Sequence, residues 1–291
     1  MISFGEDKYK PALKAMWKLC FPADTDIFID FYFGEVYKNN ETLIYFENGQ
    51  PAAAFQMLPY SLQNGGEISQ AGYISGAMTH PDFRRKGFMK ALMFASFDLM
   101  WERGFDYTFL IPQEAYLFDF YAKFGYKAVL PPESFTCRCE STGGNVPCSA
   151  YRTPLNMPKT LLHEIYSAYS RFLSEIPRTV LKSEKQFQQM LHDFFNENGV
   201  LFAGGQGVAF TFQGKNRIVI KEFFYRDQHT KDLFLKAIRN YYSQQEIVIL
   251  NSPARLTGLR GMIKRLNGGK PEISELYINM MMEGSPFTLL H

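Results

Sequence analysis

The chain has 291 residues, of which 46% are hydrophobic and 21% charged, and this balance excludes an intrinsically disordered or collagen-like protein. Its formal net charge of +2 is too small for the broad basic field that nucleic-acid binding generally requires, so we expect no nucleic-acid partner. No apolar run approaches the roughly 20 residues that cross a bilayer, and the N-terminal stretch lacks the apolar core of a signal peptide. We therefore expect a cytoplasmic protein with no membrane partner.

The length exceeds that of an ordinary single hydrophobic core, so the sequence predicts two domains. The stretch 131–150 is rich in Pro, Gly, Ser and Cys and has no sustained periodicity, which is typical of a linker. We place the boundary in this stretch and predict one domain over residues 1–145 and a second over residues 146–291.

The first domain begins with an amphipathic helix and continues as an antiparallel meander. Apolar residues recur at helical spacing over residues 7–22. Asn-Gly turns at residues 48–49 and 64–65 then divide the extended stretches of residues 41–79. We expect the helix to cover the sheet that these strands form.

A basic corner follows the meander. Residues 84–86, Arg-Arg-Lys, stand directly before Gly87 and a helical stretch over residues 88–102, and a short apolar strand follows at residues 105–112. The first turn of a helix leaves N–H groups without intrahelical partners and carries a partial positive charge, so a phosphate would fit this corner. A run of charges at a turn is also typical of a solvated surface, and the residues alone leave both interpretations open.

The second half repeats the order of elements of the first. The sequence predicts helices over residues 159–172, 183–195 and 230–242, and strands over residues 200–225 and 246–252. The predicted fold class is therefore α/β, with a mixed sheet in each domain. The match lies in the order of elements, because no residue-by-residue repeat is visible.

Two motifs resemble those of the GNAT superfamily of N-acetyltransferases. Its acyl-coenzyme A loop reads Arg or Gln, two residues, Gly, one residue, then Gly or Ala, and the loop here reads Arg84-Arg85-Lys86-Gly87-Phe88-Met89, with Met89 in place of the small residue. The stretch "FYAKFGY", residues 120–126, resembles the second signature of the family. Two ordered matches are more specific than one. The resemblance implies a GNAT fold for the first domain.

The second half is similar to the double-domain members of that superfamily, among them the enhanced-intracellular-survival type. The segments "GMIKRLN" and "ELYINMMM" near the end resemble parts of that group. The resemblance implies a degenerate GNAT-like second domain. Its corner, "FYRDQHTKDLF", has no glycine after the charged residues, so we expect it to hold no coenzyme A.

The resemblance also implies that the protein is an N-acetyltransferase that uses acetyl-CoA as a co-substrate. The pantetheine arm would pair with the strand edge at Ala77, Met78 and Thr79, and the pyrophosphate would lie on the amides that run from Arg85 to Met89. Tyr121 would donate a proton to the departing thiolate as the general acid. The alternative is a core tyrosine packed under Gly125.

Several points stay open at this stage. The resemblance implies an acceptor that is the amine of a small molecule or a peptide. The strand before the corner has no carboxylate near its end, so the base is not visible in the sequence. A water chain could serve, or, by analogy with the larger relatives, the terminal carboxylate of His291. The alternative to an enzyme is a catalytically weak acyl-CoA sensor or a partner-binding protein. The multimeric state of larger relatives leaves a homo-oligomer open.

The sequence predicts no metal site. The cysteines fit no Cys-x-x-Cys zinc pattern, and the histidines have no ligand spacing. We expect free thiols at Cys20, Cys137, Cys139 and Cys148.

Overall fold

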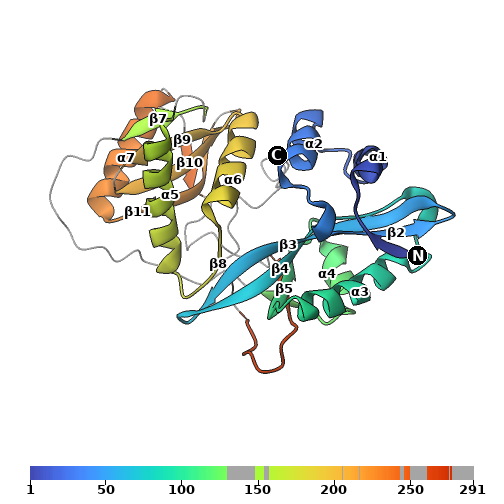
Figure 1. The fold of residues 1–291 in the computed structure, drawn as a ribbon. Helices are drawn as coiled ribbons and strands as arrows, with labels where there is room; N and C mark the ends of the chain where they lie inside the picture. Colours follow the sequence, from blue (N-terminus) through green and yellow to red (C-terminus); the bar gives the residue numbers. More distant parts are fainter. Residues whose placement is uncertain are drawn as a thin grey trace. The chain divides into compact units, whose positions relative to one another are not determined.

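The chain divides into two compact units. A computed structural model describes residues 1–129, 148–153, 157–204, 206–215, 217–242, 246–249, 261–274 and 276. Unit 1 comprises Met1–Leu130 and Leu259–Leu276, and unit 2 comprises Pro131–Gly258 and Tyr277–His291. Each unit is a sheet with helices packed on it (Figure 1). None of the helices in the described parts of the chain combines the length and the apolar character that a membrane crossing needs.

Unit 1 is built on a mixed sheet with the strand order β1-β2-β3-β4-β5-β13-β6. Neighbouring strands are antiparallel except β4 and β5, which are parallel and joined by α3. Its strands are β1 (Ile2–Phe4), β2 (Thr42–Glu47), β3 (Gln50–Asn64), β4 (Glu67–Thr79), β5 (Tyr107–Leu110), β6 (Lys127–Val129) and β13 (Gly261–Arg265). Its helices are η1 (Asp7–Tyr9), α1 (Lys10–Cys20), α2 (Asp26–Phe31), η2 (Tyr32–Val36), η3 (Asn39–Glu41), η4 (Pro81–Phe83), α3 (Phe88–Glu102) and α4 (Ala115–Ala122).

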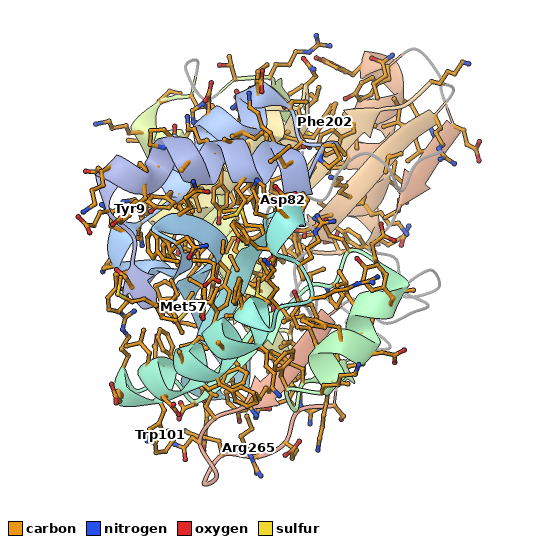
Figure 2. All side chains as sticks on the ribbon, turned by 90° about the vertical axis from the view of Figure 1, so that its right-hand side faces the viewer. Tyr9, Met57, Asp82, Trp101, Phe202 and Arg265 are labelled. Atoms are coloured by element: carbon orange, nitrogen blue, oxygen red, sulfur yellow. The ribbon has the colours of Figure 1, made fainter. Side chains whose placement is uncertain are left out.

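Helices cover both faces of this sheet. In Figure 1, α1 and α2 lie on one face and α3 and α4 on the other. The apolar spacing of α3 places Leu92 and Met100 in the buried layer, where they pack with Met57 of β3. Trp101 lies on the outer side of α3 and is 53% exposed, whereas Met57 lies between the helix layers (Figure 2). The helix expected to cover the sheet is thus confirmed as α1, and the crossover is confirmed as β4-α3-β5.

The strand β13 enters unit 1 from the far end of the sequence. It lies between β5 and β6 and is antiparallel to both, with Ile263 opposite Phe109 on one side and Lys127 on the other. The boundary prediction assigned every residue after 145 to the second domain, and for Leu259–Leu276 this is wrong. The segment belongs to unit 1 because its backbone completes the ladder of that sheet. The predicted boundary at residue 145 lies outside the described residues.

Unit 2 repeats this architecture with fewer strands. Its sheet has the order β12-β11-β10-β9-β7, and β11 and β12 are parallel and joined by α7, as β4 and β5 are joined by α3. Its elements are β7 (Ser149–Tyr151), α5 (Lys159–Ser174), β8 (Arg178–Leu181), α6 (Glu184–Asn196), β9 (Val200–Gly204), β10 (Gly207–Gln213), β11 (Arg217–Tyr225), α7 (Gln228–Tyr241) and β12 (Glu246–Ile249). Buried clusters with α5 and α6 on one face and α7 on the other give the unit its own core. The predicted α/β class with two mixed sheets is confirmed.

Candidate active site

The parallel strands β4 and β5 run together and then part. They pair over Ala71–Tyr73 and Tyr107–Phe109, after which β5 ends while β4 continues to Thr79. In the described residues no strand pairs with the β5-facing edge of β4 beyond Tyr73. This edge can therefore accept an extended ligand as an added strand.

A β-bulge interrupts β4 where the strands have parted. Two residues, Gly76 and Ala77, oppose the single residue Phe55 of β3. Gly76 has a φ of 60°, a left-handed conformation that glycine adopts without a steric penalty. A glycine inside a strand pattern is a signal for such a bulge, and the sequence shows two candidates in this strand, Gly72 and Gly76.

The residues expected to line the pantetheine arm all lie on this part of β4. The side chain of Ala77 packs against the core cluster that contains Leu92 of α3, and the side chain of Met78 faces the pocket under α1. The carbonyl of Thr79 accepts hydrogen bonds from Cys20 Sγ and Arg84 Nε, both at 3.3 Å. Sequence reasoning missed this contact of Cys20, because nothing in the sequence places the end of α1 against the end of β4.

The basic corner forms a concave run of backbone amides. Arg85 has a φ of 64° and Gly87 a φ of 84°, so left-handed residues alternate with Lys86. Such alternation turns successive N–H groups toward one point and creates an anion-binding nest. Gly87 is the N-cap of α3 and no side chain caps this end, so the partial positive charge of the helix adds to the same place. The sequence predicted the helix start but not the left-handed conformation of Arg85.

The side chains of the corner leave the nest open to solvent. Residues 84–87 are exposed, and Lys86 Nζ lies 5.0 Å from the ring centre of Phe83. Phe88 is buried and stacks on Tyr45 with ring centres 4.3 Å apart. The side chain of Met89 packs against the hydrophobic core, so the residue that departs from the motif does not fill the corner.

Tyr121 lies on α4 and is 7% exposed. Its ring contacts those of Phe120 and Tyr126, with centres 5.1 and 6.0 Å away, and no described residue forms a recorded hydrogen bond with its hydroxyl. Burial raises the pKa of Tyr121 to about 12. It packs in the same cluster as Ile74 and Leu110, which stand where β4 and β5 part. The residue is thus a buried tyrosine beside the point where β4 and β5 part, a position that suits either of the roles considered for it.

The other candidates have structural explanations or lie outside the described residues. His80 Nδ1 accepts a hydrogen bond from the Asp82 amide at 3.3 Å and caps η4, as expected of a turn histidine. Cys20 and Cys148 are free thiols. Cys137, Cys139 and His291 lie outside the described residues. The described part of the chain contains no group of three or more His, Cys, Asp or Glu side chains that could hold a metal ion.

The matching corner of unit 2 is closed by its own side chain. Asp227 is the N-cap of α7, and its carboxylate accepts a hydrogen bond from the Thr230 amide at 2.8 Å. The carboxylate also contacts Arg226 at 3.1 Å. A negative side chain therefore lies where Gly87 leaves the end of α3 uncovered, and a phosphate at this position would be repelled.

Residues 2–129 match the family model described as acetyltransferase (GNAT) domain. No curated protein sequence matches the chain. The solved structures that are similar to it include three that cover 92% of its length. A GCN5-related N-acetyltransferase from Anabaena variabilis is 15% identical, with a TM-score of 0.68 and 73% of that chain covered. Eis1 from Mycobacterium abscessus is 13% identical, with a TM-score of 0.66 and 74% covered.

The third similar structure is a conserved Enterococcus faecalis protein described as a probable N-acyltransferase. It is 12% identical, with a TM-score of 0.68, and 72% of that chain is covered. At these identities the likeness concerns the fold. Because it extends over 92% of this chain, it includes both units.

Proposed function

We propose, on the premise that residues 2–129 form an acetyltransferase domain of the GNAT family, that this protein transfers the acetyl group of acetyl-CoA to an amine. The observation that carries the proposal is the open nest at Arg85–Gly87, which stands at the end of a strand with an unpaired edge. A diphosphate on the nest and an extended arm along the edge of β4 are the contacts that coenzyme A needs. We expect one such site in each chain, because Asp227 closes the matching corner of unit 2.

The chemistry is a direct transfer between two bound substrates. The amine nitrogen attacks the carbonyl carbon of the thioester, the C–S bond breaks, and the thiolate leaves with its electron pair. The amine loses one proton and the thiolate gains one. Tyr121 supports this scheme as the donor, since burial keeps its hydroxyl protonated at neutral pH. The acceptor is the amine of a small molecule or a peptide.

The test combines coenzyme binding with turnover. Calorimetry should detect coenzyme A binding by the full chain, and release of free thiol from acetyl-CoA should depend on an added amine. A panel of aminoglycosides, polyamines and peptides would identify the acceptor class. Absence of coenzyme binding would overturn the proposal. Tight binding without turnover on any amine would favour the acyl-CoA sensor instead.

Substitution of Gly87 should separate binding from stability. A side chain at this φ costs about 1–2 kcal/mol in backbone strain. A Cβ at Gly87 meets nothing within 4 Å, so the cost is backbone strain at the proposed binding position rather than a clash within the protein. We expect Gly87→Ala to weaken coenzyme A binding by about tenfold, which corresponds to about 1.4 kcal/mol. Calorimetry on the full chain measures this change.

Gly104 provides the matched control, because it has a φ of 79° and also has no neighbour within 4 Å of a Cβ, but it follows the opposite end of α3. Gly104→Ala should lower the melting temperature by a similar amount and leave the affinity for coenzyme A unchanged. Equal losses of affinity in the two variants would contradict a ligand at Gly87.

A further inference from the structure

The indole ring of Trp17, on α1, packs directly against the bulge of β4. No room exists for a Cβ at Gly76, because Cζ3 of the Trp17 indole occupies that place. Trp17 is 5% exposed, and its Nε1 donates a hydrogen bond to Asp24 Oδ2 at 2.7 Å. The carboxylate of Asp24 therefore fixes one edge of the indole, and the other edge contacts Gly76.

A buried chain of hydrogen bonds holds the residue before the bulge. The Lys38 amide donates to Gln56 Oε1 at 3.0 Å, which fixes the orientation of the Gln56 amide group. Gln56 Nε2 then donates to Tyr32 Oη at 2.6 Å. Tyr32 Oη is also hydrogen-bonded to Ser75 Oγ at 2.8 Å.

The three side chains of this hydrogen-bond chain are buried, where hydrogen bonds are stronger than in water. Tyr32, Gln56 and Ser75 are 1%, 3% and 4% exposed, so no water competes for their hydrogen bonds. Tyr32 also packs on Trp17 with ring centres 4.5 Å apart. The Tyr32 hydroxyl therefore forms a hydrogen bond with Ser75, and the Trp17 indole contacts Gly76, the next residue of β4.

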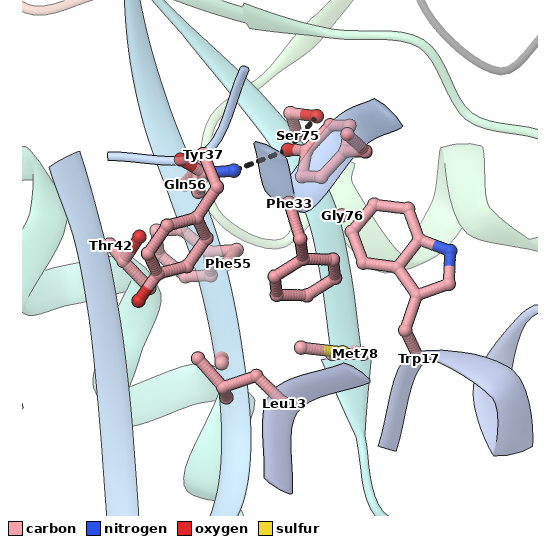
Figure 3. A pocket seen from close by; sticks show the side chains of 12 residues that line it. Leu13, Trp17, Phe33, Tyr37, Thr42, Phe55, Gln56, Ser75, Gly76 and Met78 are labelled. Carbon is pink, nitrogen blue, oxygen red and sulfur yellow. Dashed lines mark hydrogen bonds between the residues drawn. The ribbon is translucent and has the colours of Figure 1, made fainter. Parts of the chain in front are cut away.

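The local backbone is unusual where Tyr32 is presented. Tyr32 begins η2, a π-helical turn that follows α2, and such turns are frequent at functional sites. A small pocket lies between α1, η2 and the sheet, and Trp17, Gln56, Ser75 and Gly76 line it (Figure 3). The aromatic ring and the hydrogen-bonded groups that contact the bulge therefore belong to one local cluster.

We propose that Trp17 and Tyr32 are positioning residues that fix the bulge of β4 and thereby aim the backbone of Ala77 and Met78 at the reacting thioester. The proposal rests on the acetyltransferase function proposed above. Glycine in a bulge is flexible by nature, so the strand needs an external hold to keep its amides in one direction. A small misplacement of groups around the reacting atoms lowers the rate of the chemical step more than it lowers binding.

The test removes the hydroxyl of Tyr32 and keeps its ring. We expect Tyr32→Phe and Ser75→Ala each to lower kcat about tenfold, with KM for acetyl-CoA and the Kd of coenzyme A unchanged. Because the two groups share one hydrogen bond, the loss of kcat in the double variant should be smaller than the product of the two single losses. Steady-state kinetics and calorimetry on the full chain give these values.

Tyr242→Phe is the matched control. It removes a buried hydrogen bond of similar length, 2.9 Å from Tyr242 Oη to Thr211 Oγ1, in unit 2. Its melting temperature should fall as much as that of Tyr32→Phe while kcat stays at the wild-type value. Unchanged kcat in Tyr32→Phe, or an equal loss in Tyr242→Phe, would overturn the positioning role. If the wild-type chain binds no coenzyme A, the proposed function itself fails. This outcome is distinguishable from the two above, because those concern kcat of the variants.

Discussion

Replacement of Tyr121 by phenylalanine should lower kcat for acetyl transfer about 100-fold, since a positioned general acid typically contributes at least this factor. The substitution keeps the ring, which packs on Phe120 and Tyr126, so the fold should be retained. Removing the hydroxyl takes away only the proton that the departing thiolate would receive. The affinity for coenzyme A should stay nearly unchanged, because we expect the pyrophosphate at Arg85–Gly87 and the arm on the edge of β4, away from this hydroxyl. Single-turnover kinetics would measure the chemical step directly.

The pH dependence gives an independent test of this role. Burial raises the pKa of Tyr121 from the ordinary value of 10.0 to about 12, so the hydroxyl keeps its proton as the pH rises past 10. Ionisation of Tyr121 should therefore lower kcat only as the pH approaches about 12, and Tyr121→Phe should lack this fall. Tyr116→Phe is the control on the same helix, because Tyr116 is 69% exposed, and it should retain full activity. A wild-type rate in Tyr121→Phe would remove the residue from the mechanism.

A chain that ends at Gly258 should fail to form unit 1, although it contains every residue of the predicted catalytic domain. Without β13, strand β6 has no other partner strand among the described residues, and β5 loses one of its two neighbours. Met262 and Ile263 are 2% and 3% exposed, and loss of each such side chain typically costs 2–5 kcal/mol. The sum is comparable with the whole stability of a domain, about 5–15 kcal/mol. Loss of coenzyme binding and of a cooperative thermal transition for unit 1 would be measured by calorimetry.

A chain that ends at Leu276 is the matched control, because it also lacks residues 277–291 but keeps β13. It retains the bond from Tyr107 Oη to the Pro271 carbonyl at 2.9 Å and the bond from Asn267 Nδ2 to Asp106 Oδ1 at 3.0 Å. It should fold and bind coenzyme A. Turnover by this chain separately tests the terminal carboxylate of His291 as the base. Unchanged binding by the chain that ends at Gly258 would show that β13 is dispensable.

The sequence predicted the local features of the site because they depend on local chemistry. The glycine after the basic residues marks the start of α3, and the apolar spacing that follows marks its buried face. The crossover and the parallel pair followed from strand, helix and strand in order. The left-handed conformation of Arg85 could not be predicted, because an arginine adopts it only where the surrounding fold imposes it.

The features that sequence reasoning missed depend on distant contacts. The segment that forms β13 is short, and its partners at Phe109 and Lys127 lie far earlier in the chain, so no local pattern indicates the pairing. The contacts that fix the bulge likewise join Trp17 and Tyr32 to residues of β4 that lie at least 43 positions later in the sequence. Such pairings are decided by the packing of the whole unit rather than by propensity.

The late position of β13 in the sequence also determines when the sheet of unit 1 can be completed during synthesis. During synthesis β5 and β6 emerge from the ribosome long before β13 (Gly261–Arg265). The edges of β5 and β6 that pair with β13 therefore stay unpaired while β7 to β12 are translated. Multidomain chains usually complete their N-terminal domain first, whereas here unit 1 receives β13 only after strands β7 to β12 of unit 2 have been made. Until then the unpaired strand edges of the first sheet can pair with other chains, so the nascent chain needs them to be protected.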